Sequence, residues 1–486
     1  MNGLIIIIII LALMYVQISA IIVLEHRRSS RMAAWVFLVC LCPFLGFVFY
    51  LLLSKPLYRS KLLRKYALPR GSELSKLTEA EAGGRELLPA VPAEEEGQDP
   101  AYAEHHPRLI GLLDSYRQFP LTTGNLVKVL TNAESAYEAM KEQLRTAKHH
   151  IHLDYYLIRD DEVGGWIYDL LSTKASAGVE VRVLYDGLGS FKLSSSYIDK
   201  MKEAGVRMTS FLPVRLALFD KRLNYRNHRK LAVIDGRVGF VGGINLGEEY
   251  LGQDPKLGFW RDTHLQVEGE CVKVLQEIFI LDWNFAAEEQ LGLSDYYKPT
   301  GVRGNEEVVI VSSGPTPYDA SILEVLFEAL NAARSRIYMT TPYFIPDLSL
   351  LMSLRTAALS GVDVRIILPG VSDSRLVLLA SLSYVKDLME AGVRFYRYQR
   401  GFLHAKVLLI DRELASVGSA NVDMRSLHIN FELNALLFGQ TTIDRLYADF
   451  EQDLSDSMLL CPEEFMHRSK LQRLGEAAAN ILSPLL

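Results

Sequence analysis

The sequence is poor in cysteine and has no surplus of basic residues. Four Cys among 486 residues are too few for a disulfide-stapled scaffold. The chain has 52 Lys and Arg against 58 Asp and Glu, a net charge of −6, so we expect no nucleic-acid partner. Gly and Pro, at 33 and 18, are in ordinary proportion, which excludes a collagen-like chain. Apolar residues make up 49%, which excludes a disordered chain.

Two stretches near the N-terminus lack charge altogether, residues 3–24 and 32–53. Each has 22 residues, and a helix needs about 20 to cross a bilayer. No Lys or Arg precedes Leu24, whereas a signal peptide begins with a basic region. We therefore predict a membrane anchor over residues 1–65 with two transmembrane helices, and a multi-pass protein of the cell membrane.

Basic residues are concentrated around these apolar stretches. Residues 1–65 hold eight Lys and Arg and one acidic residue; three of the eight lie between the stretches and five follow the second. Positive residues favour the cytoplasmic side, which predicts both ends of the anchor, and the rest of the chain, in the cytoplasm. Cys271 and Cys461 fit a reducing compartment. The basic charge suits an anionic lipid membrane.

Beyond the anchor, a spacer is followed by one unit repeated twice. Residues 66–107 hold three basic and nine acidic residues and several prolines, which predicts a flexible acidic linker. Further on, residues 177–184 match 360–367, and residues 203–207 match 390–394. Strand-like runs alternate with helical ones in both copies. We predict an α/β fold with two tandem domains, residues 108–300 and 301–486, related by an approximate two-fold axis.

Both copies end in the same pattern, H-x-K-x4-D followed by x6-G-[GS]-x-N. A single H-x-K-x4-D is expected by chance about once in several tens of chains of this kind. Two copies at equivalent points of a repeat are not explained by chance. The first copy supplies His228, Lys230, Asp235, Gly243 and Asn245, and the second supplies His404, Lys406, Asp411, Ser419 and Asn421.

The pattern is suited to a phosphodiester. Short apolar runs follow each Lys, so each motif lies on a strand, where the His and the Lys share one face. The Asp lies an odd number of positions away, so we expect Asp235 and Asp411 to orient the backbone or a neighbour. One imidazole can attack phosphorus while the other donates a proton. Lysine ammonium groups offset the phosphate charge, the glycines allow close approach, and Asn245 and Asn421 offer amide donors.

Two carboxylates complete the predicted site. Aligned on their closing glycines, residues 260–269 and 431–439 place Asp262 and Glu432 at matching positions. A carboxylate on the far ring nitrogen fixes a histidine's tautomer. We therefore expect Asp262 to serve His228 and Glu432 to serve His404.

We expect no metal and no cofactor. Lys is a poor metal ligand, and the sequence shows neither zinc spacing nor a loop with clustered carboxylates. A further trio, His149, His150 and His152, flanks a strand that looks buried, and we expect it to be structural.

These motifs resemble the phospholipase D superfamily, and nearly the whole chain is similar to its bacterial cardiolipin synthases. The resemblance implies a membrane-bound phosphatidyltransferase that joins two phosphatidylglycerol molecules into cardiolipin and releases glycerol. It also implies a phosphohistidine intermediate, with His228 as nucleophile and His404 as acid and base. The partners would be phosphatidylglycerol and an anionic membrane.

Alternatives remain open at the level of sequence. The same motifs fit a hydrolytic phospholipase D, a transferase that uses another acceptor alcohol, a nuclease, or a membrane scaffold without activity. Residues 203–228 form a longer segment than their counterpart, residues 390–404, and include an apolar stretch followed by Lys221, Arg222 and Arg226. This segment could admit acyl chains and headgroups, or simply pack as a surface loop.

Overall fold

The structure is a computed structural model. It describes residues 2–25, 29–53, 106–116, 119–212, 225–287, 289–297, 301, 304–315 and 322–483. The predicted acidic linker, apart from residues 106 and 107, lies outside the described residues, and so does most of the apolar segment before His228.

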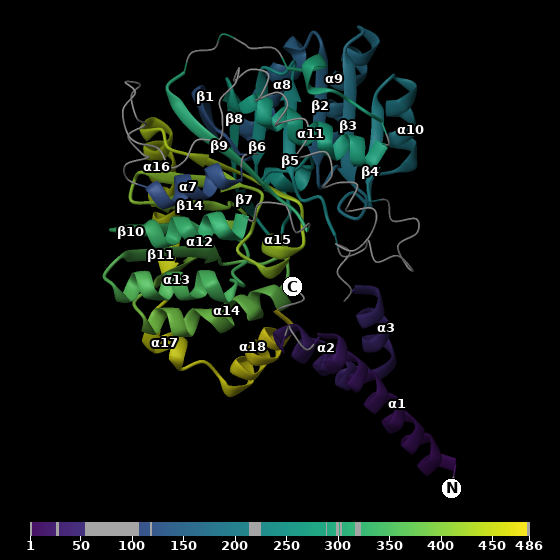
Figure 1. Cartoon of the computed structure of the whole chain (residues 1–486), viewed down its shortest axis with the longest axis vertical. Helices are drawn as coiled ribbons and strands as arrows, with labels where there is room; N and C mark the ends of the chain where they lie inside the picture. Colours follow the sequence, from purple (N-terminus) through teal and green to yellow (C-terminus); the bar gives the residue numbers. More distant parts are fainter. Residues whose placement is uncertain are drawn as a thin grey trace.

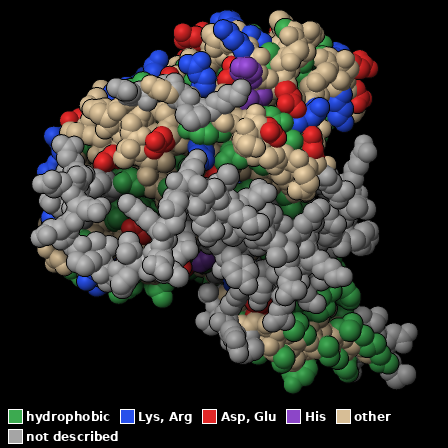
Figure 2. Space-filling model, turned by 45° about the horizontal axis from the view of Figure 1, so that its top comes forward, with side chains coloured by type: hydrophobic (Ala, Val, Ile, Leu, Met, Phe, Trp, Pro, Cys, Tyr) green, Lys and Arg blue, Asp and Glu red, His purple; other side chains and the backbone are tan. Residues whose placement is uncertain are grey.

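The N-terminal region contains one helix that could span a membrane, not two. Helix α1 (Asn2–Glu25) is mostly exposed and includes a candidate span at residues 7–25. The second apolar stretch is broken into α2 (Ser29–Leu41) and α3 (Pro43–Leu53). Among the described residues no other helix is long and apolar enough to cross a bilayer. Figure 2 shows this region as an apolar surface beside the rest of the chain.

The prediction of a second transmembrane helix at residues 32–53 is therefore wrong, and the cause is a fold at Pro43. Proline lacks a backbone N–H and ends the preceding helix. Trp35 and Tyr50 would be about 22 Å apart along one straight helix, yet their ring centroids lie 5.5 Å apart. A Cβ at Gly46 would lie 2.7 Å from the carbonyl oxygen of Leu38, so glycine permits the close approach. Helix α3 thus folds back along α2.

Fifteen of the strands of the remaining described residues form one sheet, in which each half has the same strand order, and β7 and β13 form a separate two-stranded sheet. The first half runs β1-β8-β6-β5-β2-β3-β4 and the second β9-β16-β15-β14-β10-β11-β12, followed by β17. Equivalent strands β1 and β9 pair antiparallel at the junction, with Leu121 opposite Val309. The shared strand order agrees with the predicted repeat (Figure 1).

The strand bounds follow the repeat. In the first half they are β1 (Leu121–Thr131), β2 (His150–Tyr155), β3 (Glu180–Asp186), β4 (Arg207–Phe211), β5 (Lys230–Ile234), β6 (Val238–Gly242), β7 (Phe259–Arg261) and β8 (Thr263–Glu268). In the second they are β9 (Glu306–Ser313), β10 (Arg336–Thr340), β11 (Asp363–Pro369), β12 (Arg394–Tyr398), β13 (Gly401–Leu403), β14 (Val407–Ile410), β15 (Leu414–Gly418), β16 (Glu432–Leu437) and β17 (Ser457–Leu459).

Helices cover both faces of this sheet. The first-half helices are α7 (Pro107–Ser115), α8 (Asn132–Thr146), α9 (Glu162–Ser176), α10 (Ser195–Glu203) and α11 (Cys271–Ala287), with short turns η4 (Glu248–Leu251) and η5 (Leu293–Asp295). The second-half helices are α12 (Ile322–Ala332), α13 (Leu348–Leu359), α14 (Arg375–Glu390), α15 (Met424–His428), α16 (Gln440–Ser455), α17 (Pro462–Met466) and α18 (Lys470–Leu482). Because the sheet is covered on both faces, strands such as β2, β5 and β14 are buried along their whole length.

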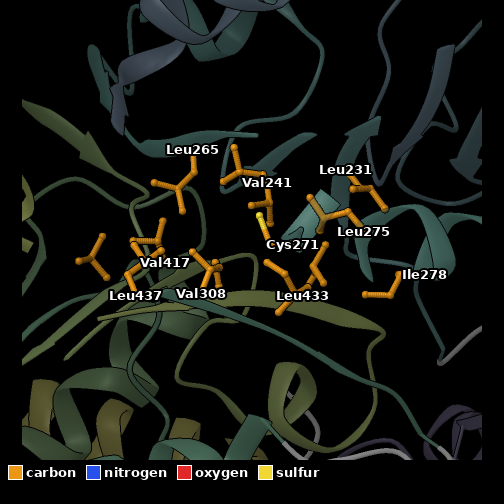
Figure 3. Close-up of a cluster of buried hydrophobic side chains, with 14 of the residues drawn as sticks. Leu231, Val241, Leu265, Cys271, Leu275, Ile278, Val308, Val417, Leu433 and Leu437 are labelled. Carbon is orange, nitrogen blue, oxygen red and sulfur yellow. The ribbon is translucent and has the colours of Figure 1, made fainter. Parts of the chain in front are cut away.

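A core shared by both halves lies on one face of the sheet. It joins α11 and strands of the first half to α16 and strands of the second, for example Leu231 and Leu265 to Val417 and Leu433 (Figure 3). Outer cores lie under α8 to α10 and under α12 to α14. Helix α7, although it precedes β1, packs Leu109 and Leu113 into the second of these outer cores. The halves are thus held together by buried apolar surface as well as by the β1–β9 ladder.

Candidate active site

Both motif histidines follow short stretches of chain that pair with the opposite half. Strand β13 runs parallel to β7, and the next residue, His404, donates its backbone N–H to the carbonyl of Arg261 at 2.7 Å. Likewise Asn227 forms a bridge with Phe431, and the N–H of His228 donates to the carbonyl of Phe431 at 2.9 Å. Each histidine is therefore fixed to the backbone of the other half, at the junction between the halves.

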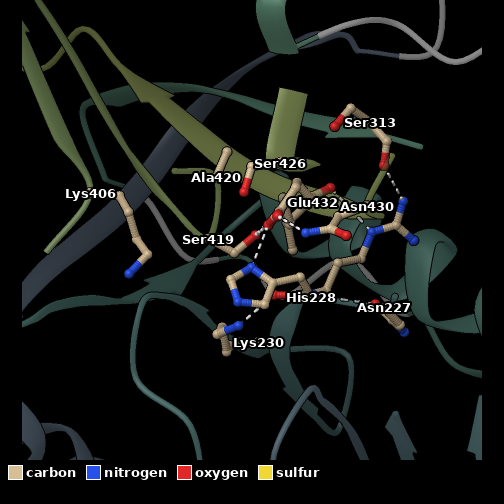
Figure 4. Close-up of polar contacts among 12 residues, drawn as sticks. Asn227, His228, Lys230, Ser313, Lys406, Ser419, Ala420, Ser426, Asn430 and Glu432 are labelled. Carbon is tan, nitrogen blue, oxygen red and sulfur yellow. Dashed lines mark hydrogen bonds and ion pairs between the residues drawn. The ribbon is translucent and has the colours of Figure 1, made fainter. Parts of the chain in front are cut away.

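This exchange decides which carboxylate each histidine meets. The residue after Arg261 is Asp262, and its Oδ2 lies 2.7 Å from Nδ1 of His404. The residue after Phe431 is Glu432, and its Oε2 lies 3.0 Å from Nδ1 of His228 (Figure 4). The predicted partners are thus exchanged: Asp262 serves His404 and Glu432 serves His228. The expectation that each carboxylate serves the histidine of its own half is wrong, because the repeat alignment could not show that the pairing strands cross between halves.

The two carboxylates are buried and stay ionised. Burial raises the pKa of each, but interactions with His404 and Lys406 outweigh it at Asp262, and interactions with His228 and Lys230 outweigh it at Glu432, so both pKa values lie below their ordinary range. Each ionised carboxylate accepts the Nδ1 proton of its histidine, which leaves Nε2 as the reactive nitrogen of the ring.

The two motif lysines join the histidines at the centre. Nζ of Lys230 donates to the carbonyl of His228 at 2.6 Å, and Nζ of Lys406 donates to that of His404 at 2.5 Å. Both ammonium groups are buried, and burial lowers the pKa of Lys230 to about 7 and that of Lys406 to about 8. Each lysine also lowers the pKa of the other half's histidine through its charge, as adjacent cations do. The four side chains therefore form one site.

Burial keeps both imidazoles neutral in the absence of a substrate. It lowers the pKa of His404 to about 3, assisted by Lys406 and opposed by Asp262. The pKa of His228 is also lowered by burial, while Glu432 raises it. A neutral imidazole is the form that can act as a nucleophile. A bound phosphodiester adds negative charge and favours the protonated form that can act as an acid.

The motif aspartates point away from this centre, as their positions on the strands predict. Asp235 accepts hydrogen bonds from the backbone N–H groups of residues 148, 149 and 150. Asp411 accepts the equivalent bonds from residues 334, 335 and 336. Both adopt a left-handed backbone, with φ of 55° and 50°. They tie the end of each motif strand to the start of β2 and β10, so they are positioning residues.

Gly243 and Ser419 make the two halves unequal. A Cβ at Gly243 would lie 2.1 Å from Oδ1 of Asp262, so only glycine leaves room for this carboxylate. The hydroxyl of Ser419 instead donates to Oε2 of Glu432 at 2.5 Å. This hydroxyl, which Gly243 lacks, therefore acts on the carboxylate that holds His228.

The two asparagines are engaged with neighbouring side chains. Asn245 accepts from the backbone N–H of Leu157 at 3.2 Å and donates to the hydroxyl of Tyr250. Asn421 hydrogen-bonds Asp423. Burial raises the pKa of the Asp423 carboxyl, and this hydrogen bond partly offsets that rise. Direct donation to a phosphate by Asn245 and Asn421 stays a prediction.

Several residues of the site escaped the sequence analysis. Asn227 and Arg229, which flank His228, are fully buried. Asn227 donates to both oxygens of Asp154, at 2.9 and 3.0 Å. Arg229 binds Asp282 and donates to the carbonyl of Glu432 at 3.2 Å. The comparison of repeats hid this pair, because the second copy has Leu403 and Ala405 at these positions.

Aromatic rings enclose the two histidines. The ring of Tyr156 lies 4.9 Å from that of His228, and the ring of Trp260 lies 5.2 Å from that of His404. Nζ of Lys230 lies 5.2 Å from the centre of the Tyr156 ring. These contacts exclude water from the imidazoles and strengthen the electrostatic interactions there.

The other histidines that the sequence singled out lie elsewhere. His150 and His152 are buried and both hydrogen-bond Gln276, at 2.9 and 2.8 Å, and burial lowers both pKa values. They belong to the packing of the first half. Within the described part of the chain, no group of three or more His, Cys, Asp or Glu residues could hold a metal ion.

The comparisons with known proteins agree with this geometry. The family described as "Cardiolipin synthase, PLD-like domain" matches residues 140–283 and 326–454. The chain is 42% identical to the cardiolipin synthase of Halalkalibacterium halodurans over 473 residues, which cover 97% of this chain and 92% of that protein. It is 40% identical to cardiolipin synthase 2 of Bacillus anthracis over 471 residues, covering 96% and 89%.

A solved structure shares the fold at much lower identity. It is that of phosphatidylserine synthase from Haemophilus influenzae, with a TM-score of 0.59 and 14% identity, covering 77% of this chain and 96% of that one. This likeness supports the arrangement of the two halves and no more.

Proposed function

Because this chain belongs to the cardiolipin synthase family with phospholipase D-like domains, and is thus an enzyme that makes cardiolipin, we propose that it transfers a phosphatidyl group between two phosphatidylglycerol molecules through a phosphohistidine. The observation that carries the proposal is the pair of histidines at one site, each held by a carboxylate of the other half.

The proposed first step forms the intermediate. Nε2 of His228 attacks the phosphorus of the first phosphatidylglycerol, the P–N bond forms, and the bond from phosphorus to the glycerol headgroup breaks. His404 gives its proton to the leaving glycerol oxygen. The ammonium groups of Lys230 and Lys406 offset the charge of the non-bridging oxygens. Glu432 stabilises the cation that forms on His228.

The second step restores the enzyme. His404 takes the proton of a hydroxyl on the headgroup of the second phosphatidylglycerol, and that oxygen attacks the phosphorus. The P–N bond breaks and cardiolipin leaves. Two phosphatidylglycerol molecules thus give one cardiolipin and one glycerol, with no oxidant, metal or cofactor in the balance.

The order of basic residues in the sequence supports a membrane arrangement. All eight Lys and Arg of residues 1–65 come after α1, the one candidate span among the described residues. By the positive-inside rule we infer one span, α1, with the catalytic region in the cytoplasm.

Purified full-length protein in detergent, given phosphatidylglycerol and a metal chelator, tests the reaction. We expect cardiolipin and glycerol in equal amounts, and no turnover by His228→Ala or His404→Ala. Phosphatidic acid as the sole product would contradict synthesis and indicate hydrolysis. A product formed only with an added alcohol would indicate another acceptor.

A further inference from the structure

Helix α18 presents an apolar face that nothing in the described chain covers. Leu471, Leu474 and Ile481 are 80%, 67% and 39% exposed, and Leu471 is the most exposed large apolar residue among the described ones. Their spacing of three and seven residues places them on one side of the helix.

The opposite side of α18 fixes the helix firmly to the catalytic body. Ala479 packs with Ala380 of α14 in a small buried cluster. Glu476, also buried, accepts from the guanidinium of Arg468 at 2.6 Å. At the far end the hydroxyls of Ser483 and Tyr384 lie 2.9 Å apart. The exposed leucines therefore belong to an ordered helix with a defined orientation.

Helix α18 lies next to the membrane anchor. It contacts α2, and Figure 1 shows the two helices side by side at the end of the catalytic body from which α1 extends. Helix α1 is the candidate span, so a helix that touches α2 lies at the level where that span ends. Lys470 and Arg473, both exposed, lie beside the apolar face. An apolar face bordered by basic residues is the pattern of a helix that lies in a lipid interface.

We propose that α18 lies flat in the interface of an anionic membrane, as a second contact besides α1. Leu471, Leu474 and Ile481 enter the acyl region, and Lys470 and Arg473 meet lipid phosphates. The proposal rests on the membrane location inferred for α1.

This contact would also orient the active site. The small cluster that holds Ala479 includes Met424, the first residue of α15. Met424 follows the motif residue Asn421 by three positions. A helix fixed at the membrane surface therefore fixes the second motif relative to the lipid from which the substrate comes.

Spin labels on full-length protein test the depth of this face. Cys40, Cys42 and Cys461 are first replaced by Ser, and Cys271, which is buried, is kept. One label is placed by Leu471→Cys and a matched control by Asn480→Cys, an exposed polar position of the same helix outside the apolar face. The protein is reconstituted in vesicles of phosphatidylglycerol and phosphatidylcholine. Relaxation by oxygen, which partitions into lipid, is compared with relaxation by a water-soluble nickel chelate.

At position 471 we expect oxygen to relax the label several-fold more effectively than nickel, and at position 480 the reverse. Equal nickel access at both positions would overturn the proposal. Dipolar broadening between labels at 471 would overturn it as well, since the face would then cover a second copy of the chain. The measurement does not depend on turnover, so absence of cardiolipin synthesis would contradict the proposed function and leave this result standing. High nickel access at position 471 in an enzyme that still makes cardiolipin would contradict the proposed membrane contact of α18 and leave the proposed function standing.

Discussion

Oε2 of Glu432 lies 3.0 Å from Nδ1 of His228, although the two residues belong to opposite halves of the repeat. The mirrored pair, Asp262 and His404, lies at 2.7 Å. Each half thus supplies one histidine and the carboxylate for the other, so neither half contains a complete acid–base pair.

The exchanged pairing predicts selective effects on the histidine pKa values. Because Glu432 raises the pKa of His228, Glu432→Gln should lower it and leave that of His404 nearly unchanged. Asp262→Asn should lower the pKa of His404 and leave that of His228 nearly unchanged. NMR titration of isotopically labelled histidines measures both. An effect of Glu432→Gln on His404 larger than on His228 would contradict the pairing. Either substitution should also lower kcat by about 10²- to 10⁴-fold, because each removes support from an acid–base group.

The two histidines should differ with an activated substrate. Phosphatidyl-p-nitrophenol has a leaving group that needs no proton. His404→Ala should therefore still release a burst of nitrophenol, about one equivalent per enzyme, and then stop. His228→Ala should release none, since no nucleophile remains. A burst from His228→Ala and none from His404→Ala would reverse the assigned roles.

The buried lysines predict an alkaline limit of activity. Burial lowers the pKa of Lys230 to about 7 and that of Lys406 to about 8. As pH rises through these values the free enzyme loses the positive charges that bind phosphate, so kcat/KM should fall between about pH 7 and pH 9. A bound phosphodiester raises both lysine pKa values, so the fall in kcat should come at higher pH. Initial rates at several pH values measure both limits, and a kcat/KM that rises over this range would contradict the role of the lysines.

Gly243 and Ser419 should tolerate substitution differently. In Gly243→Ala the new methyl would meet the carboxylate of Asp262 at 2.1 Å, so we expect displacement of Asp262 and loss of kcat by about 10²-fold or more. Ser419→Ala removes one hydrogen bond to Glu432 and leaves the carboxylate in place. A hydrogen bond to a charged acceptor is worth about 1.5–3 kcal/mol. Comparable kcat values for Gly243→Ala and the unsubstituted enzyme would show that the site can adjust.

Arg229 should be needed for stability as well as for the site. It is fully buried and paired with Asp282, so Arg229→Met removes the cation of a buried ion pair and should cost about 3–5 kcal/mol. The double variant Arg229→Met with Asp282→Leu should recover much of this loss. Thermal unfolding in detergent measures both variants. Arg229 also donates to the carbonyl of Glu432, so the double variant should remain slow even where its stability is restored.

The sequence by itself determined the repeat, the two motifs and the chemistry they are suited to. Strand periodicity placed each His and Lys on one face and turned Asp235 and Asp411 to the backbone, because these relations depend only on neighbouring residues. It could not show which carboxylate meets which histidine. That choice depends on β7 pairing with β13 across the halves. This pairing brings together Asp262 and His404, which lie 142 positions apart in the sequence.

The tertiary structure alone also decided the membrane anchor and the residues flanking His228. Composition and length made residues 32–53 look like a span, but the packing of Trp35 on Tyr50 folds the stretch at Pro43. Asn227 and Arg229 have no counterpart in the repeat, and their partners, Asp154 and Asp282, come from distant elements. Local sequence fixes which side chains share a face of a strand. The approach of two halves of the sheet fixes which of those side chains meet.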